Sequence, residues 1–394
     1  MTRQRISVSG AAASQIGLRS LSRGGRLSTR LTFFIAGFGL ACWAPLVPFA
    51  QARIEAGPAE LGTILLNLGL GAVIGMPAAG ALSGKIGSRF VIMAGAAGMI
   101  IALPLLAIIS NAFGLGACLL LFGCAIGALD VAANIHGSEV QAAAGISLMS
   151  GFHGFYSVGG LVGAGATTLA IAIGFDAALA AGLAAGIILL CLVLAIPGFL
   201  TSRSTETHPL FVVPHGRVLL IGLLAMVLFL AEGAMLDWVA LLLTQAKQVD
   251  VAYSGVGYTV FALAMTISRL AGDRMVARAG ERIMLTAGLL LTASGFALTA
   301  FAPGFGSVLV GIALAGFAAG NVVPVLFTLA GRQRMPPTHA IAAVSMLGYF
   351  GVLMGPALVG YAAYFVGLGG AFGAMAAVML LSAPVVSRIT DDTL

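Results

Sequence analysis

The chain has 394 residues, of which 60% are hydrophobic and 8% are charged, and its net charge is +6. Its mean hydropathy of +1.09 is far above what a water-soluble protein can carry on its surface. A separate soluble domain is also excluded, because no polar stretch is long enough to fold alone. Runs of about 18 or more apolar residues indicate bilayer-spanning helices. We therefore predict an all-α integral membrane protein with twelve transmembrane helices, near residues 31–50, 61–82, 90–109, 113–136, 145–171, 177–199, 217–241, 254–276, 283–301, 305–330, 338–365 and 368–386.

Residues 1–30 are rich in Arg and Ser and contain no acid. We predict a disordered cytoplasmic tail here, because no short apolar core precedes the first span to make a signal peptide. With this tail inside and twelve crossings, all of the 19 Lys and Arg residues except Arg53 and Lys247 fall on the cytoplasmic side. This is the positive-inside pattern of a bacterial inner-membrane protein with both termini cytoplasmic. The positive charge therefore requires no nucleic-acid partner.

The spans divide into two groups of six. Residues 201–216 are the longest polar interruption after the tail, and they separate residues 31–200 from residues 217–394. We expect a cytoplasmic linker at this position, with one six-helix bundle on each side of it.

The two halves carry similar short segments. Trp43 is followed by Gln51-Ala52-Arg53, and Trp238 is followed by Gln245-Ala246-Lys247, at an offset of 195 (238 − 43). The turns that begin at Gly87 and Gly280 are 193 residues apart (280 − 87). Such a parallel repeat predicts two bundles related by an axis along the membrane normal, with a cavity between them at mid-depth.

The loop GALSGKIGSR, residues 80–89, resembles the signature Gly-x-x-x-Asp-Arg-x-Gly-Arg of the major facilitator superfamily. Gly80, Lys85 and Gly87 fit this pattern, and the resemblance to the superfamily extends over essentially all of the chain after residue 30. The signature aspartate is replaced by Gly84, and its counterpart in the second half is Ala277. The charge network that locks the outward-facing state in relatives is therefore expected to be weakened.

Four further segments are similar to the MosC/YbjJ-type branch of that superfamily, which lies near the fucose permeases. They are LDVAAN (129–134), SGFHGFYSVGGLVGA (150–164), EGAMLDW (232–238) and GNVVPVLF (320–327). The resemblance implies a secondary transporter that works by alternating access, and it does not identify the solute.

Three acids, Asp130, Glu232 and Asp237, lie inside predicted spans, where charged residues are costly and usually line a cavity or relay protons. Asp130 and Asn134 are four residues apart and share one helix face. His153 follows in the next helix at a similar depth, and an Asp–His pair can hold or pass one proton. We predict that Asp130, His153 and Glu232 carry protons; the alternative for Asp130 is a buried hydrogen bond that pins two helices.

Polar and aromatic side chains near the predicted cavity are candidates for contacts with the solute. We predict this role for Asn134, Asp237, Trp238, Trp43 and Asn321. Asp237 near the outer mouth also suits a gate ion pair or a helix cap, the tryptophans suit interfacial anchors, and Asn321 suits a helix kink. His136, by contrast, is expected at the membrane rim in contact with solvent.

The leading hypothesis is a proton-coupled secondary transporter for a small polar solute such as a sugar, polyol or amino sugar. Its partners would be that solute, protons and membrane lipids, and the protein would act as a monomer. The sequence provides no motif for a nucleotide, haem, metal or other cofactor. A multidrug efflux antiporter is the alternative, and it would need a mainly aromatic cavity. An intramembrane hydrolase is disfavoured, because His153 and Ser157 alone are a weak catalytic signal. We therefore expect a protein without enzymatic activity.

Overall fold

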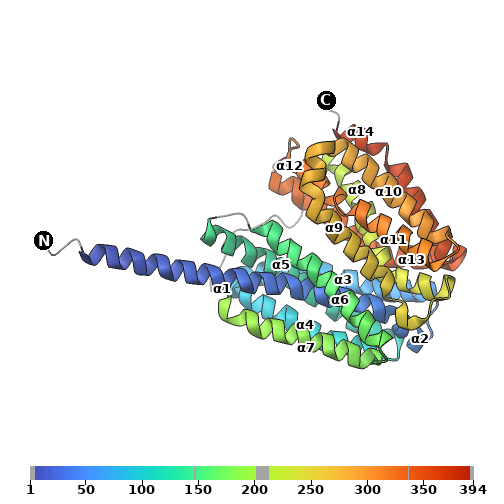
Figure 1. Cartoon of the computed structure of the whole chain (residues 1–394), viewed down its shortest axis with the longest axis horizontal. Helices are drawn as coiled ribbons and strands as arrows, with labels where there is room; N and C mark the ends of the chain where they lie inside the picture. Colours follow the sequence, from blue (N-terminus) through green and yellow to red (C-terminus); the bar gives the residue numbers. More distant parts are fainter. Residues whose placement is uncertain (1–4, 146–147, 201–212, 336, 391–394) are drawn as a thin grey trace.

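The fold was obtained as a computed structural model that describes residues 5–145, 148–200, 213–335 and 337–390. Figure 1 shows that the described regular elements are helices, which form one bundle from the first half of the chain and another from the second. The α-helices are α1 Arg5–Trp43, α2 Val47–Ile54, α3 Pro58–Ile86, α4 Ser88–Ile108, α5 Ala112–Ala144, α6 Met149–Ala172, α7 Ala177–Ala195, α8 Gly216–Leu241, α9 Val256–Ala279, α10 Glu281–Phe301, α11 Phe305–Ala319, α12 Val322–Gly331, α13 Pro337–Ser382 and α14 Val385–Thr390.

The number of membrane crossings agrees with the twelve that we predicted. Among the described residues, 11 helical segments are long and apolar enough to cross a membrane. The last of them, Ala343–Ser382, has 40 residues and contains Gly367, whose φ of 73° is not helical. At 1.5 Å per residue, a length of about 60 Å is twice the hydrocarbon thickness, so this segment crosses twice.

The N-terminal region differs from the predicted disordered tail over residues 1–30. Helix α1 begins at Arg5, and Figure 1 shows its first turns extending away from the bundles. The candidate span begins at Gly24 rather than at residue 31. Extension of a helix costs far less than its nucleation, so a chain segment without proline continues the helix that the buried span has started.

The backbone confirms the parallel repeat. In each half, residues with positive φ mark corresponding turns, at a constant offset of 193 residues (248 − 55, 280 − 87 and 367 − 174). Gly87 and Gly280 have φ of 94° and 79°, which glycine adopts without steric cost, and each directly precedes a 21-residue helix, α4 or α10. The residues related in this way are Glu55 and Gln248, Gly87 and Gly280, and Gly174 and Gly367.

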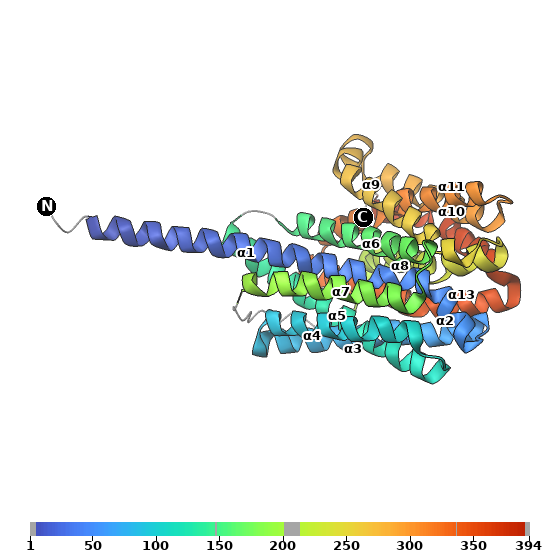
Figure 2. The ribbon, with the colours of Figure 1, turned by 60° about the horizontal axis from the view of Figure 1, so that its bottom comes forward.

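The turns lie on two opposite faces, because successive spans alternate in direction. We call the face with Gly87 and Gly280 the terminal face, since the first span begins there and the last one ends there. The face with Glu55 and Gln248 is called the far face. Figure 2 shows α1 entering the bundle from the terminal side and reaching α2 at the far side.

The two bundles meet mainly through α3 against α13 and α6 against α9. Near the far face these helices touch: a Cβ on Gly62 would lie 2.7 Å from the carbonyl oxygen of Pro356 and 3.1 Å from Cα of Gly360. Near the terminal face, no described atom lies within 4 Å of a Cβ built on Gly151 or Gly154 in α6. The bundles are therefore in contact from the far face to mid-depth and apart beside the start of α6.

Glycines allow close packing inside the first bundle. A Cβ on Gly71 in α3 would clash with the carbonyl oxygen of Leu120, and one on Gly123 in α5 would clash with that of Leu68. The two backbones are in direct contact, as small residues permit in membrane helices. In α7, by contrast, a Cβ on Gly182 would meet open space.

We expect Gly123→Ala to lower the melting temperature of the purified protein, because the added methyl group forces α3 and α5 apart. Overpacking of this kind typically costs about 1–3 kcal/mol. Gly182→Ala is the matched control and should leave thermal unfolding unchanged. Equal melting temperatures for the two variants would contradict the close α3–α5 contact.

Candidate transport site

Asp130 in α5 lies at the centre of a polar network between the bundles. Its Oδ2 accepts a hydrogen bond of 3.1 Å from the hydroxyl of Tyr349 in α13, a residue of the other bundle. Asn134 Nδ2, one turn further along α5, donates to the backbone oxygen of Asp130 at 2.9 Å and reaches its Oδ1 at 3.5 Å. The predicted proximity of Asp130 and Asn134 is therefore present, and the tyrosine adds a contact across the bundle interface.

Arg269 in α9 forms the second contact across the interface. Its Nη1 donates to Ser157 Oγ in α6 at 3.3 Å, and its Nε donates to the backbone oxygen of Gly320 at 3.4 Å. Nη2 lies 3.9 Å from Glu232 Oε2 in α8, and both side chains are about one-third exposed. One guanidinium group on α9 thus contacts α6 of the first bundle and two other segments of the second, α8 and the break between α11 and α12.

His153 and Tyr156 of α6 complete the network. His153 is exposed, its charge interacts with those of Asp130 and Arg269, and its ring packs edge-on against Phe33 at 4.9 Å. Tyr156 is half-buried and interacts electrostatically with Asp130, Glu232 and Arg269. The spacing of His153, Tyr156 and Ser157 places all three on one face of α6. His153 therefore interacts with Asp130 as predicted, although the hydrogen bonds to the Asp130 carboxylate come from Tyr349 and Asn134.

The network contains two carboxyl groups and one guanidinium group with a permanent charge. Glu232 is paired with Arg269, whereas the side chains that hydrogen-bond to Asp130 are the neutral Tyr349 and Asn134. With His153 neutral, the charges sum to −1 when Asp130 is ionised and to zero when it carries a proton. Such an arrangement can hold one proton and can offer both donors and acceptors to a polar solute.

Asp237, Trp238 and Trp43 are buried nearer the far face than this network. Asp237 is 2% exposed and the two tryptophans are 0% exposed. The indole of Trp43 is close enough to the Asp237 carboxyl to interact with it across the bundle interface. These residues, which we predicted as solute contacts, are closed off from any solute in this conformation, and the buried indoles do not act as interfacial anchors.

Asn321 was predicted to face the cavity, but the structure places its amide elsewhere. It is 4% exposed, and its Nδ2 donates to the backbone oxygen and the hydroxyl of Ser268, both at 2.8 Å. Asn321 also lies at the break between α11 and α12. Its role is to hold that break against α9, because the irregular backbone needs a partner within the membrane.

His136 also differs from the prediction of a solvated residue at the membrane rim. Its ring is fully buried, Nδ1 pairs with Thr29 Oγ1 at 2.9 Å, and Nε2 accepts from the backbone nitrogen of Leu200 at 3.0 Å. Phe199 packs edge-on against it at 5.3 Å. His136 therefore joins α5 to α1 and to the end of the first bundle.

Arg269, Tyr349, Tyr156 and Ser157 belong to the network but were not predicted as members of it. For Arg269 a signal existed: it stands ten residues before the end of α9, about 15 Å inside the helix, and is not a terminal-face residue as we assumed. The tyrosines and the serine carried no such signal, because these side chains are ordinary in membrane helices.

Comparisons with known proteins agree with this architecture. The family model described as Major Facilitator Superfamily matches residues 221–393. An uncharacterised MFS-type transporter of Yersinia pestis is 44% identical over 368 residues, covering 93% of this chain and 96% of the relative. The chain belongs to the major facilitator superfamily. Within this superfamily, the membrane protein MosC of Rhizobium meliloti is 32% identical over 340 residues, covering 86% of this chain and 83% of MosC.

Solved structures of the superfamily share the fold. A variant of the nucleoside transporter NupG superposes with a TM-score of 0.78 at 13% identity, covering 94% of this chain and all of that one. The human organic anion transporter MFSD10 gives a TM-score of 0.61 at 15% identity, with 93% and 99% covered. The Yersinia pestis relative is named an MFS-type transporter, and with 11 candidate spans among the described residues this superfamily member is a multi-pass membrane transporter.

Proposed function

We propose that the protein is a proton-coupled secondary active transporter that moves a small polar solute across the bacterial inner membrane by alternating access. The observation that supports this most directly is the polar network at mid-depth, where Asp130–Tyr349 and Ser157–Arg269 join the two bundles. A solute bound among these groups would contact both bundles, so its binding could be coupled to their relative movement. One chain supplies both halves of the site, which suits a monomer.

Asp130 is the favoured proton carrier. Glu232 has Arg269 beside it, whereas Asp130 is hydrogen-bonded by neutral groups, so its charge has no fixed counter-ion in the network. An acid in this setting is neutral in one step of the cycle and charged in another, which is how intramembrane acids relay protons. His153 is placed to stabilise the charged form or to pass the proton on.

The solute class follows from the groups that surround the network. Tyr156, Tyr349, Ser157 and Asn134 offer hydroxyl and amide groups, and Arg269 offers charged donors. These side chains suit a solute with several hydroxyl groups, such as a sugar, polyol or amino sugar. NupG is named a nucleoside transporter, which makes nucleosides worth testing. The efflux of apolar drugs is the weaker candidate, because the contacts between the bundles at mid-depth are polar.

The decisive experiment is transport into proteoliposomes. A thermal-shift screen of sugars, polyols, amino sugars, nucleosides and amphipathic drugs identifies a ligand, because binding to the folded state raises the melting temperature with concentration. The ligand found should then accumulate unchanged when a pH gradient is imposed. Recovery of a hydrolysed product would instead indicate an intramembrane hydrolase, and uptake that ignores the pH gradient would contradict proton coupling.

We further propose that the terminal face is cytoplasmic, with residues 31–200 and 217–394 as the two bundles and 201–216 as a cytoplasmic linker. Single cysteines that replace Ser204, which lies outside the described residues, and Gln248, on the far face, should react with an impermeant reagent from opposite sides of the membrane. In intact cells we expect labelling at position 248 and none at position 204 until the membrane is permeabilised. Labelling of both positions in intact cells would contradict this orientation.

A further inference from the structure

Asp237 is an acid that the central network does not use. It lies five residues beyond Glu232 in α8, and its carboxyl oxygen Oδ1 is buried without a hydrogen-bond partner among the described residues. The indole nitrogen of Trp43, which is close enough to the Asp237 carboxyl to interact with it, is likewise buried and makes no full hydrogen bond among the described residues. The indole nitrogen of Trp238 is also buried without a partner, but that ring lies against Gly360 of α13. Two incompletely satisfied polar groups, Asp237 and Trp43, therefore meet where the end of α1 in one bundle approaches α8 of the other. Native interiors contain few such atoms, and each calls for an explanation.

The cations that could neutralise Asp237 are engaged elsewhere. Arg53 donates to the backbone oxygens of Leu106 and Ile109, both at 2.7 Å. In the second half, Lys247 donates to the backbone oxygens of Ala300 and Ala302, at the corresponding end of α10, at 3.0 and 2.8 Å. Each far-face cation thus holds its own bundle together.

The other ionisable groups around Asp237 provide no counter-charge either. Glu232 on α8 pairs with Arg269. Tyr258, from α9, is influenced by the charge of Asp237, whereas Tyr361, from α13, is 52% exposed and its hydroxyl lies near Thr63. The first bundle presents the uncharged Trp43. A carboxylate that is buried without a cation or a full set of hydrogen bonds is strongly disfavoured, so the neutral acid is the form that this closed arrangement accommodates.

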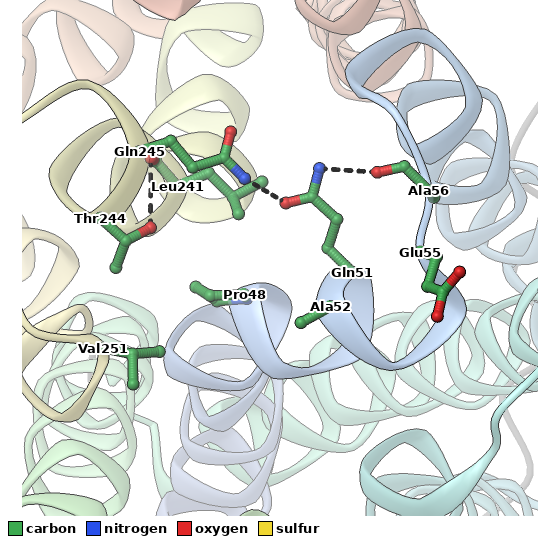
Figure 3. Close-up of a pocket in the computed structure, with 9 residues that line it drawn as sticks. All are labelled: Pro48, Gln51, Ala52, Glu55, Ala56, Leu241, Thr244, Gln245 and Val251. Carbon is green, nitrogen blue, oxygen red and sulfur yellow. Dashed lines mark hydrogen bonds between the residues drawn. The ribbon is translucent and has the colours of Figure 1, made fainter. Parts of the chain in front are cut away.

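A pair of glutamines, which we call the gate, joins the two bundles on the far-face side of Asp237. Gln245 Nε2 donates to Gln51 Oε1 across the interface at 2.6 Å, and Gln51 Nε2 donates to the backbone oxygen of Ala56 at 3.0 Å (Figure 3). These glutamines border a cavity of about 340 Å³ that Glu55, Thr244 and Val251 also line. Asp237 does not line this cavity, and it lies eight residues, about 12 Å, before Gln245 along the same helical segment.

The two chain segments that lead to Gln51 and Gln245 each contain a turn of irregular helix shortly after a buried tryptophan. A 3₁₀ turn, Ala44–Leu46, follows Trp43, and a π-helical turn, Leu242–Ala246, follows Trp238 by a few residues. Short 3₁₀ and π segments within helices often mark hinges or functional sites. Bending at these two turns would break the glutamine contact and admit water to Asp237.

We propose that Asp237 is a second proton-binding residue, which takes up a proton when the far face closes and releases it when the far face opens. The proposal rests on the proposed proton coupling. In the open state the hydrated carboxylate accepts a proton from the far-face solution, and the resulting carboxylic acid is then buried with Trp43. On reopening, the O–H bond breaks and the proton returns to water. Closure therefore consumes one proton, and a lower pH favours the closed far face.

The test follows the width of the gate in purified protein without solute or a pH gradient. Spin labels on cysteines that replace Ala52 and Val251, which line the cavity from opposite bundles, report the distance across it. One linked proton changes the ratio of closed to open molecules by up to about tenfold per pH unit. We expect this ratio to rise as the pH falls in the wild-type background, a titration that requires no substitution at Asp237.

Asp237→Asn mimics the neutral acid and should hold the gate closed at every pH, with the response lost. Glu55→Gln, an exposed acid in the same cavity, is the control and should respond like the wild type. Asp130→Asn should also keep the response, which separates this proposal from the role of Asp130 in transport. A wild-type ratio that ignores pH, or a response that survives Asp237→Asn, would overturn the proposal.

Discussion

Asp130→Asn should abolish solute accumulation driven by a pH gradient while preserving solute exchange. One coupled proton supports about tenfold accumulation of a neutral solute per unit of pH gradient, since one pH unit is worth 1.36 kcal/mol. Asparagine keeps the size of the side chain and can still accept the hydrogen bond from Tyr349, which measures 3.1 Å. It cannot bind a proton, so accumulation should fall to the level of simple equilibration. Uptake against a concentration gradient in proteoliposomes is the measurement.

Asp176→Asn is the matched control for this substitution. Asp176 is exposed at the start of α7, where its carboxylate accepts a hydrogen bond of 2.7 Å from the nitrogen of Leu179. Asparagine caps helices equally well, so this variant should transport like the wild type. If Asp130→Asn accumulates solute normally at equal protein levels, Asp130 is a packing residue. The proton role would then pass to Glu232, or the coupling ion is not a proton.

Arg269→Gln should nearly eliminate solute binding and also destabilise the protein. Hydrogen bonds from a charged donor typically contribute about 1.5–3 kcal/mol, so the affinity should fall by about 10- to 100-fold. The substitution also leaves Glu232 without its cation inside the membrane, which lowers the melting temperature. Ligand-binding titrations and thermal unfolding measure these two effects separately.

The double variant Arg269→Gln, Glu232→Gln distinguishes a binding residue from a purely structural one. Removal of both charges should restore the melting temperature, because no unpaired carboxylate remains, whereas the affinity should stay low. Arg332→Gln is the control, since Arg332 pairs with Glu281 at 2.8 Å on an exposed surface where such pairs contribute little. Recovery of binding in the double variant would show that Arg269 acts only as a counter-ion.

Four of the residues predicted from the sequence, Asp130, Asn134, His153 and Glu232, belong to the polar network between the bundles. Each of these could be found because a charged or strongly polar side chain within an apolar span has a cost that must be offset by a function or a partner. Asn321, a predicted solute contact, is instead hydrogen-bonded to Ser268, and His136, expected in contact with solvent, is buried with Thr29 and the Leu200 backbone as partners. The cost of burying each of these two polar side chains is offset by hydrogen bonds to neighbouring segments. Only the tertiary structure shows which segments these are.

The sequence by itself determined the membrane environment, the twelve crossings and the parallel repeat. The first two follow from hydropathy over the length of a span and from the placement of positive charge. The repeat follows from segments that recur at a nearly constant offset. The tertiary structure decided that Tyr349 reaches Asp130, that Arg269 joins both bundles, and that Asp237 is sealed beside Trp43 when the far face is closed. These pairings join residues 219, 112 and 194 positions apart (349 − 130, 269 − 157 and 237 − 43). Hydropathy does not encode which helix packs against which, because lipid and protein neighbours are both apolar. Helix pairing depends instead on the close packing of small residues and on interhelical hydrogen bonds.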